Sequence, residues 1–123
     1  MYKMYKEPQN DSKYHWTNHV KDKMRYYRIS ESLVKRVVRF PKRLEKGIAP
    51  QTSAAMQPRM VNGKTKEEIW VMYQEEKKRT KEKLLLAPKK KIISAWRYPG
   101  ESPKRGPIPI PEEILSELDI VID

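Results

Sequence analysis

The apolar residues of this chain change their spacing partway along, and that change limits the fold more than any other feature. Up to Phe40 they recur every three or four positions, which is the period of an amphipathic helix. From residue 52 to residue 98 they fall in strand-like runs, and Asn62-Gly63 between two of these runs is a strong hairpin signal. A chain of 123 residues with 37% hydrophobic residues can build one modest core. Helices and strands must therefore pack together.

Two helices are predicted in the first part of the chain. The apolar residues of the first helix form one stripe: Trp16, Val20, Met24 and Tyr27. Ser30 is a good N-cap for the second helix, and Pro41 ends that helix near Phe40. The predicted buried face of the second helix consists of Leu33, Val34, Val37 and Val38.

Three strands are predicted after the helices, near residues 52–60, 67–75 and 91–98. Alternation along the second strand divides its apolar residues between two faces: Ile69, Val71 and Tyr73 on one, Trp70 and Met72 on the other. Apolar residues on both faces are typical of a central strand. Pro58 indicates that the first strand is an edge strand or is bulged, because proline cannot donate to the ladder.

The predicted fold class is α+β, with two N-terminal helices packed on an antiparallel sheet of three to four strands. A Pro-rich extended C-terminal tail and a short terminal helix follow. We expect a flexible arm at residues 1–13, a folded domain at 14–98, and a Pro-rich linker with an acidic C-terminal segment at 99–123. We expect residues 76–90 to form a long, mobile hairpin loop, and a short helix is the alternative.

Charge is the strongest bulk signal, because 27 Lys and Arg against 16 Asp and Glu give a net charge of +11. Such a chain attracts polyanions and is expected to bind nucleic acid in a salt-dependent way, although a solvated lysine-rich surface is the alternative. After Arg105 there are five acids and no bases. We expect this acidic tail to dock on the protein's own sheet or on a second copy. The alternative is that it folds back over the concave face of the sheet and competes with the nucleic acid.

The sequence contains no cysteine, no long apolar run and no apolar signal-peptide core, which favours a cytoplasmic protein without a membrane segment. His15 and His19 are spaced one helical turn apart, but no cysteine or acidic pair lies beside them. We therefore expect no metal and no cofactor.

Two stretches carry a family resemblance. In HVKDKMRYYRISESLVKRVVRFPKRLEKG the matching positions are His19, Lys23, Met24, Ile29, Ser30 and Pro41. The later stretch IISAWRYP is similar to a final strand that typically carries Tyr or Arg near its end. Over about residues 15–98 the chain thus resembles the small bacterial and phage domains related to the RelE/ParE and BrnT toxins. It departs from their pattern before the Ile-Ser turn, where Tyr27 and Arg28 stand in place of the usual arginine.

The resemblance implies a curved antiparallel sheet with helices on one face and an exposed concave face that binds RNA. Many members of this family cleave RNA without a metal ion. The partners implied are RNA or the ribosome, together with a small antitoxin, another protein or a second copy of the chain.

RNA cleavage by 2′-hydroxyl attack needs a base, an acid and positive charge near the phosphorane. The catalytic candidates are His19 as base, Arg97 as phosphate clamp and Tyr98 beside them. Further nucleic-acid-binding candidates are Lys23, Arg36, Arg39, Arg43, Arg59 and Trp96. Each has a structural alternative: His19 can hold the first helix to the sheet, and Trp96 and Tyr98 can belong to the core. Because these two aromatic residues alternate with Arg97, we expect Arg97 on the open face.

Three classes of function stay open on this sequence. The leading hypothesis is an RNA-binding protein that acts as a metal-independent endoribonuclease toxin. The alternative is a non-catalytic nucleic-acid- or protein-binding module of the same fold from a phage or mobile element. The third is a structural subunit whose acidic tail docks on a neighbour.

Overall fold

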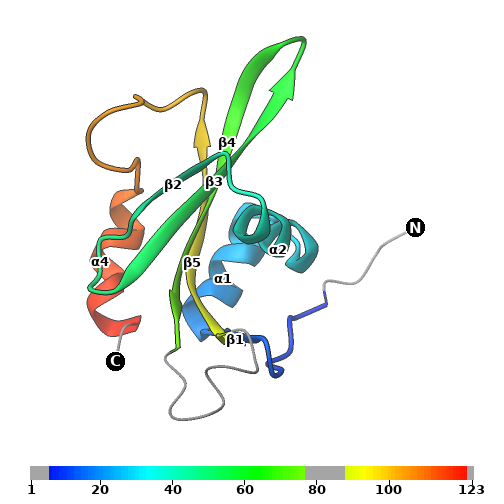
Figure 1. The fold of residues 1–123 in the computed structure, drawn as a ribbon, viewed down its shortest axis with the longest axis vertical. Helices are drawn as coiled ribbons and strands as arrows, with labels where there is room; N and C mark the ends of the chain where they lie inside the picture. Colours follow the sequence, from blue (N-terminus) through cyan, green and yellow to red (C-terminus); the bar gives the residue numbers. More distant parts are fainter. Residues whose placement is uncertain (1–5, 77–87, 122–123) are drawn as a thin grey trace.

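The computed structural model describes residues 6–76 and 88–121, without the side chains of residues 119–121. Within these ranges the fold is α+β, as predicted, and combines three helices with one five-stranded sheet (Figure 1). The predictions for residues 1–5 and for residues 77–87 lie outside the described residues. Residues 6–13 form neither helix nor strand and lead into the first strand.

The strands are β1 (Tyr14–Trp16), β2 (Arg43–Lys46), β3 (Thr52–Val61), β4 (Lys64–Glu75) and β5 (Lys90–Pro99). Their order in the sheet is β1-β5-β4-β3-β2. The three predicted strands are confirmed as β3, β4 and β5. The predicted antiparallel sheet of three to four strands is wrong, because β1 runs parallel to β5 and β2 adds a second edge. Both additional strands are too short to give a clear period-two pattern.

The helices are α1 (Asn18–Tyr27), α2 (Glu31–Arg39) and α4 (Glu112–Val121). The predicted cap of α2 is confirmed, since the Ser30 hydroxyl accepts a hydrogen bond from the Leu33 N–H at 3.1 Å. The predicted start of α1 is wrong. Thr17 caps α1 by accepting from the Val20 N–H at 3.1 Å, so Trp16 belongs to β1 rather than to the helix.

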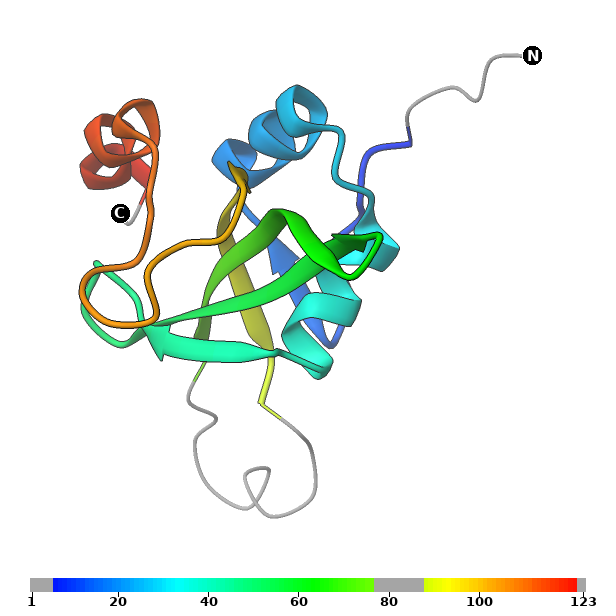
Figure 2. The ribbon, with the colours of Figure 1, turned by 90° about the horizontal axis from the view of Figure 1, so that it is seen from above.

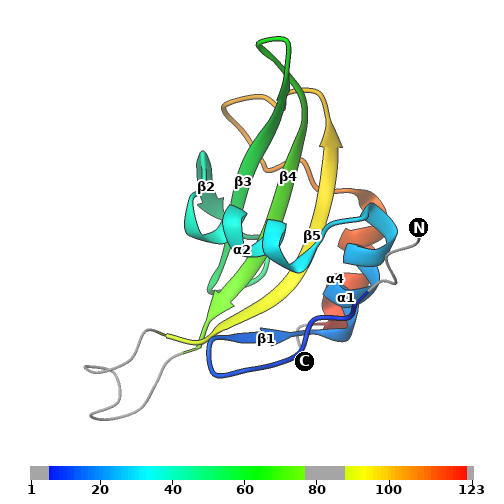
Figure 3. The same cartoon turned by 90° about the vertical axis from the view of Figure 1, so that its right-hand side faces the viewer.

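The sheet is buried on both faces, and Figures 2 and 3 show α2 and α4 on opposite sides of it. On the side that we call the α2 face, Val20 of α1 and Val34 of α2 pack against Ile69, Val71, Tyr73 and Ile92. On the α4 face, Ile114 and Leu118 of α4 pack against Trp70, Met72, Ile93 and Trp96. The predicted division of the β4 side chains is confirmed. The exposed face implied by the family resemblance is wrong, because α4 covers it.

The β3–β4 hairpin extends beyond its neighbours in the sheet (Figure 1). β2 pairs with β3 only as far as Met56, and β5 pairs with β4 only as far as Glu67. The register of β3 shifts between Arg59 and Met60, next to Pro58, so the predicted bulge is confirmed. At the tip, Asn62 and Gly63 both have positive φ, the conformation that the Asn-Gly signal predicts.

Candidate nucleic-acid-binding site

Arg97 lies on the α2 face, not on an open face as the sequence predicts. Its Nε donates to the carbonyl oxygen of Tyr27 at 2.7 Å, and its Nη2 donates to the carbonyl oxygen of Arg28 at 3.0 Å. Its Nη1 binds Glu67 at 3.0 Å. Carbonyl groups at the end of a helix lack partners within the helix and attract positive charge. Arg97 therefore holds the C-terminal end of α1 against the sheet.

A pocket opens beside Arg97, between α2 and the β3–β4 hairpin. We call it the arginine pocket, and its lining consists of Leu33, Arg36, Gln57, Pro58, Arg59, Met60, Ile69 and Arg97. Strand register explains this grouping. Gln57 pairs with Ile69, and Ile69 pairs with Arg97, so the three side chains form a row across one face of the sheet. Arg59 lies two residues beyond Gln57 on the same strand.

The Gln57 side chain ties the end of α2 to β3. Its amide nitrogen donates to the carbonyl oxygen of Phe40 at 2.6 Å and to that of Arg36 at 3.3 Å. Arg36, Arg39 and Phe40 are all exposed, and Phe40 keeps 70% of its surface in solvent. The tie therefore fixes the main chain at the end of α2, which carries Arg36 beside the arginine pocket and Arg39 and Phe40 close to it in sequence.

The arginine pocket has an excess of positive charge. Glu67 forms ion pairs with both Arg59 and Arg97, so one carboxylate faces two guanidinium groups. Arg36 has no ion pair within residues 6–76 and 88–121. Arg59 and Arg97 therefore lie on either side of one carboxylate.

His19 is in the core, where it joins three elements. Its Nε2 contacts the Ser94 hydroxyl at 2.9 Å, and its Nδ1 contacts the Glu117 carboxylate at 2.9 Å. A proton on Nδ1 satisfies Glu117, and Nε2 then accepts from Ser94. Burial lowers the pKa of His19, although the Glu117 charge acts in the opposite direction. The order Ser, His, acid is that of a nucleophilic triad, but Ser94 is 0% exposed and His19 is 9% exposed. The contacts serve to hold α1, β5 and α4 together.

The three catalytic candidates do not meet at one point. His19 lies eight residues before Tyr27 in α1, and Tyr27 carries the carbonyl oxygen that Arg97 binds. Eight helical residues span about 12 Å, too far for His19 and Arg97 to contact one phosphate. Lys23, predicted to bind nucleic acid, instead pairs with Glu117 at 3.2 Å.

Trp96, Tyr98 and Arg43 all belong to the α4 face. Trp96 stacks on Trp70, with ring centroids 6.2 Å apart, and its Nε1 donates to the Pro109 carbonyl oxygen at 2.8 Å. Tyr98 is half-buried in the same cluster. Trp96 therefore belongs to the core, which is the structural alternative to its predicted role in nucleic-acid binding. The Arg43 guanidinium lies over the Trp70 ring, 5.3 Å from its centroid.

The chain between β5 and α4 is bound closely to the sheet. Arg43 donates to the Pro103 carbonyl oxygen at 2.9 Å and to the Ser102 hydroxyl at 3.1 Å. Glu68, which the sequence did not single out, is 2% exposed and accepts from the Trp70 Nε1 and the Ser102 N–H. These contacts and the burial of α4 confirm that the tail docks on its own sheet.

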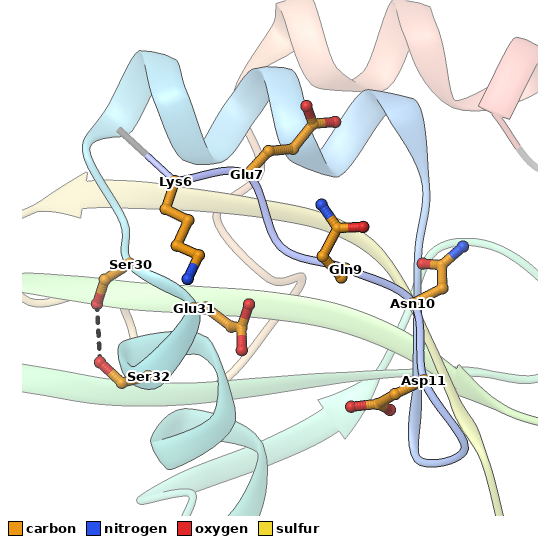
Figure 4. A pocket seen from close by; sticks show the side chains of 8 residues that line it. All are labelled: Lys6, Glu7, Gln9, Asn10, Asp11, Ser30, Glu31 and Ser32. Atoms are coloured by element: carbon orange, nitrogen blue, oxygen red, sulfur yellow. Dashed lines mark hydrogen bonds between the residues drawn. The ribbon is translucent and has the colours of Figure 1, made fainter. Parts of the chain in front are cut away.

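A second hollow lies between residues 6–11 and the start of α2 (Figure 4). Two of its polar side chains, Asp11 and Asn10, bind backbone N–H groups of the same segment. The Asp11 carboxylate accepts from the N–H groups of Lys13 and Tyr14, each at 2.8 Å, and these bonds lower the pKa of Asp11. The Asn10 side chain accepts from the Trp16 N–H at 2.7 Å. This hollow therefore helps to fix the chain before β1.

Some residues of the arginine pocket could not be singled out from the sequence. Gln57, which lines the pocket, has no motif of its own, and it matters because it reaches the carbonyl oxygen of Phe40 at the end of α2. Alternation could have placed Gln57 and Arg59 on one face, but it does not show that α2 ends beside that face.

No helix in residues 6–76 and 88–121 is long and apolar enough to cross a membrane. Comparisons of the chain with protein-family models, with curated proteins and with solved structures found no match. The resemblance to the RelE/ParE and BrnT toxins therefore stays a prediction.

Proposed function

We propose that this protein binds RNA through a basic surface at the end of α2 and the adjoining hairpin. The basic surface consists of Arg36, Arg39, Phe40 and Arg59, together with the arginine pocket between them. The observation that carries the proposal is the tie between Gln57 and the last turn of α2, because it fixes exposed arginines from two elements around one pocket.

The chemistry of the basic surface suits RNA. Arginine binds phosphate through two parallel N–H groups, and its charge does not depend on pH in the physiological range. Phe40 presents an exposed ring next to these arginines, and aromatic rings in RNA-binding proteins stack on unpaired bases. The resemblance to RelE/ParE and BrnT domains favours RNA over DNA.

Binding without cleavage is the form of the proposal that the geometry supports best. His19 is buried against Ser94 and Glu117, and Arg97 is bound to the end of α1. Tyr98 lies on the opposite face of β5 from Arg97. No base, acid and phosphate clamp come together on the basic surface within the described residues. This corresponds to a nucleic-acid-binding module rather than to a nuclease.

The test is the affinity for a short, labelled RNA, measured by fluorescence anisotropy at low salt. The double variant Arg36→Ala/Arg39→Ala should bind about tenfold more weakly or worse, because each hydrogen bond to a charged group contributes about 1.5 kcal/mol or more. The control variant Lys13→Ala/Lys46→Ala loses the same charge away from the basic surface. Equal losses of RNA affinity in both variants would mean that the net positive charge attracts RNA without a preferred surface. RNA cleavage, or growth arrest when the protein is expressed, would instead indicate a toxin.

A further inference from the structure

We infer that the arginine pocket accepts one unstacked nucleobase, so that the partner is single-stranded RNA rather than an RNA duplex. This inference rests on the proposed function and adds the kind of RNA to it. It follows from three features of the pocket: its floor, its free polar atoms and the arginines at its rim.

The floor of the arginine pocket is apolar. Leu33 from α2, Pro58 from β3 and Ile69 from β4 contribute to it. The pocket has a volume of about 310 Å³, at the lower end of the sizes that small-molecule sites have. An apolar floor of this size suits the flat face of one base better than a hydrated phosphate.

The walls of the pocket offer a fixed acceptor beside strong donors. Both protons of the Gln57 amide nitrogen are used on the carbonyl groups of Phe40 and Arg36. Within the described residues nothing donates to the Gln57 Oε1, so this oxygen is available to an N–H of a base. Among the described residues, Arg59 uses only its Nε, for Glu67, so that its terminal amino groups are free to donate there.

The rim places positive charge where the phosphates of that nucleotide would lie. Arg36 approaches from α2 and Arg59 from the hairpin, so a base in the pocket has a guanidinium on either side. A paired and stacked base cannot enter such a pocket, because its flat faces and its pairing edge are covered. The arrangement therefore selects an unpaired strand.

The test compares single-stranded and duplex RNA of equal length, using adenosine-only and uridine-only strands as probes. Wild-type protein should bind a single strand several-fold more tightly than the duplex. Leu33→Trp fills the pocket without changing charge and should weaken single-strand binding about tenfold, the size of one lost base-stacking contact. Its dependence on salt should stay that of the wild type, since the phosphate contacts are kept. Leu44→Trp, on the exposed edge of β2, is the matched control.

A second variant covers the case in which Leu33→Trp fails to fold. Gln57→Leu keeps the size and charge of the side chain but removes the acceptor together with the donors to the end of α2, and it should reduce any difference in affinity between adenosine-only and uridine-only strands. Absence of RNA binding by the wild type would overturn the proposed function itself. Wild-type binding that falls in Arg36→Ala/Arg39→Ala but not in Leu33→Trp or Gln57→Leu would overturn the base pocket alone. Duplex binding as tight as single-strand binding would also overturn it.

Discussion

Arg97 shows how a residue that resembles a ligand-binding arginine can serve the fold. Its guanidinium supplies hydrogen bonds to two carbonyl groups at the end of α1 and to Glu67. Arg97→Ala should therefore lower stability by about 1.5 kcal/mol or more, because two partly buried acceptors and one exposed acceptor lose a charged donor. Arg97→Lys should recover little, since one ammonium group cannot reproduce the planar fork. Thermal unfolding followed by circular dichroism measures both effects. Unchanged stability with lost RNA binding would restore Arg97 as a ligand-binding residue.

His19 should make stability depend on pH. Burial lowers its pKa below the ordinary value of 6.5, although Glu117 opposes this shift and Lys23 adds to it. As pH falls, the unfolded chain takes up the proton first, so stability decreases below about pH 6.5 and this loss is complete below the folded-state pKa. The melting temperature should thus fall between about pH 7 and about pH 5. The fall should be smaller in His19→Gln and unchanged in the control His15→Gln. Identical profiles for all three proteins would contradict this assignment.

At the scale of elements, long and regular patterns could be predicted, whereas short elements depend on their partners. α2 follows from its Ser30 cap and its valines, and β4 from alternation on two faces. β1 could not be predicted, because Trp16 fits the helical stripe of α1 equally well and only pairing with β5 makes it a strand. Alternation along β5 predicts that Arg97 and Trp96 lie on opposite faces of the sheet. It could not show that α4 covers the face with Trp96. Which face of the sheet is covered depends on packing between residues far apart in the chain.

The contribution of α4 can be tested by removing it. Deletion of residues 107–123 uncovers Trp70 and Trp96 and removes the Glu117 contacts to α1. The melting temperature should fall by about ten degrees or more, because losing the whole helix should cost more than the several kcal/mol of truncating one buried leucine. Leu118→Ala is a milder form of the same change and should cost about 2–4 kcal/mol. RNA affinity of folded Leu118→Ala should be unchanged, because the basic surface lies on the α2 side. Tighter RNA binding at an unchanged melting temperature would instead identify α4 as an inhibitory segment.

For the whole molecule, the positions of the acidic residues decide where a polyanion approaches more than the net charge of +11 does. Ion pairs within the described residues use carboxylates such as Glu31, Glu45 and Glu67. α4 packs on the face opposite α2, and it carries Glu112, Glu113 and Glu117. The acids of α4 are therefore held away from Arg36 and Arg39, and long-range attraction favours approach of a polyanion to the basic surface.

The salt dependence of RNA binding tests this distribution. If Arg36, Arg39 and Arg59 each neutralise one phosphate, the logarithm of the binding constant should fall with the logarithm of salt concentration with a slope of about −2 for a single strand. Affinity should then drop roughly twentyfold between about 50 and 200 mM salt. In Arg36→Ala/Arg39→Ala the slope should be about −0.7, because one phosphate contact is left. The control variant Lys13→Ala/Lys46→Ala should keep the wild-type slope. A slope that decreases equally in both variants would show that the positive charge acts as a diffuse cloud, with no preferred surface for RNA.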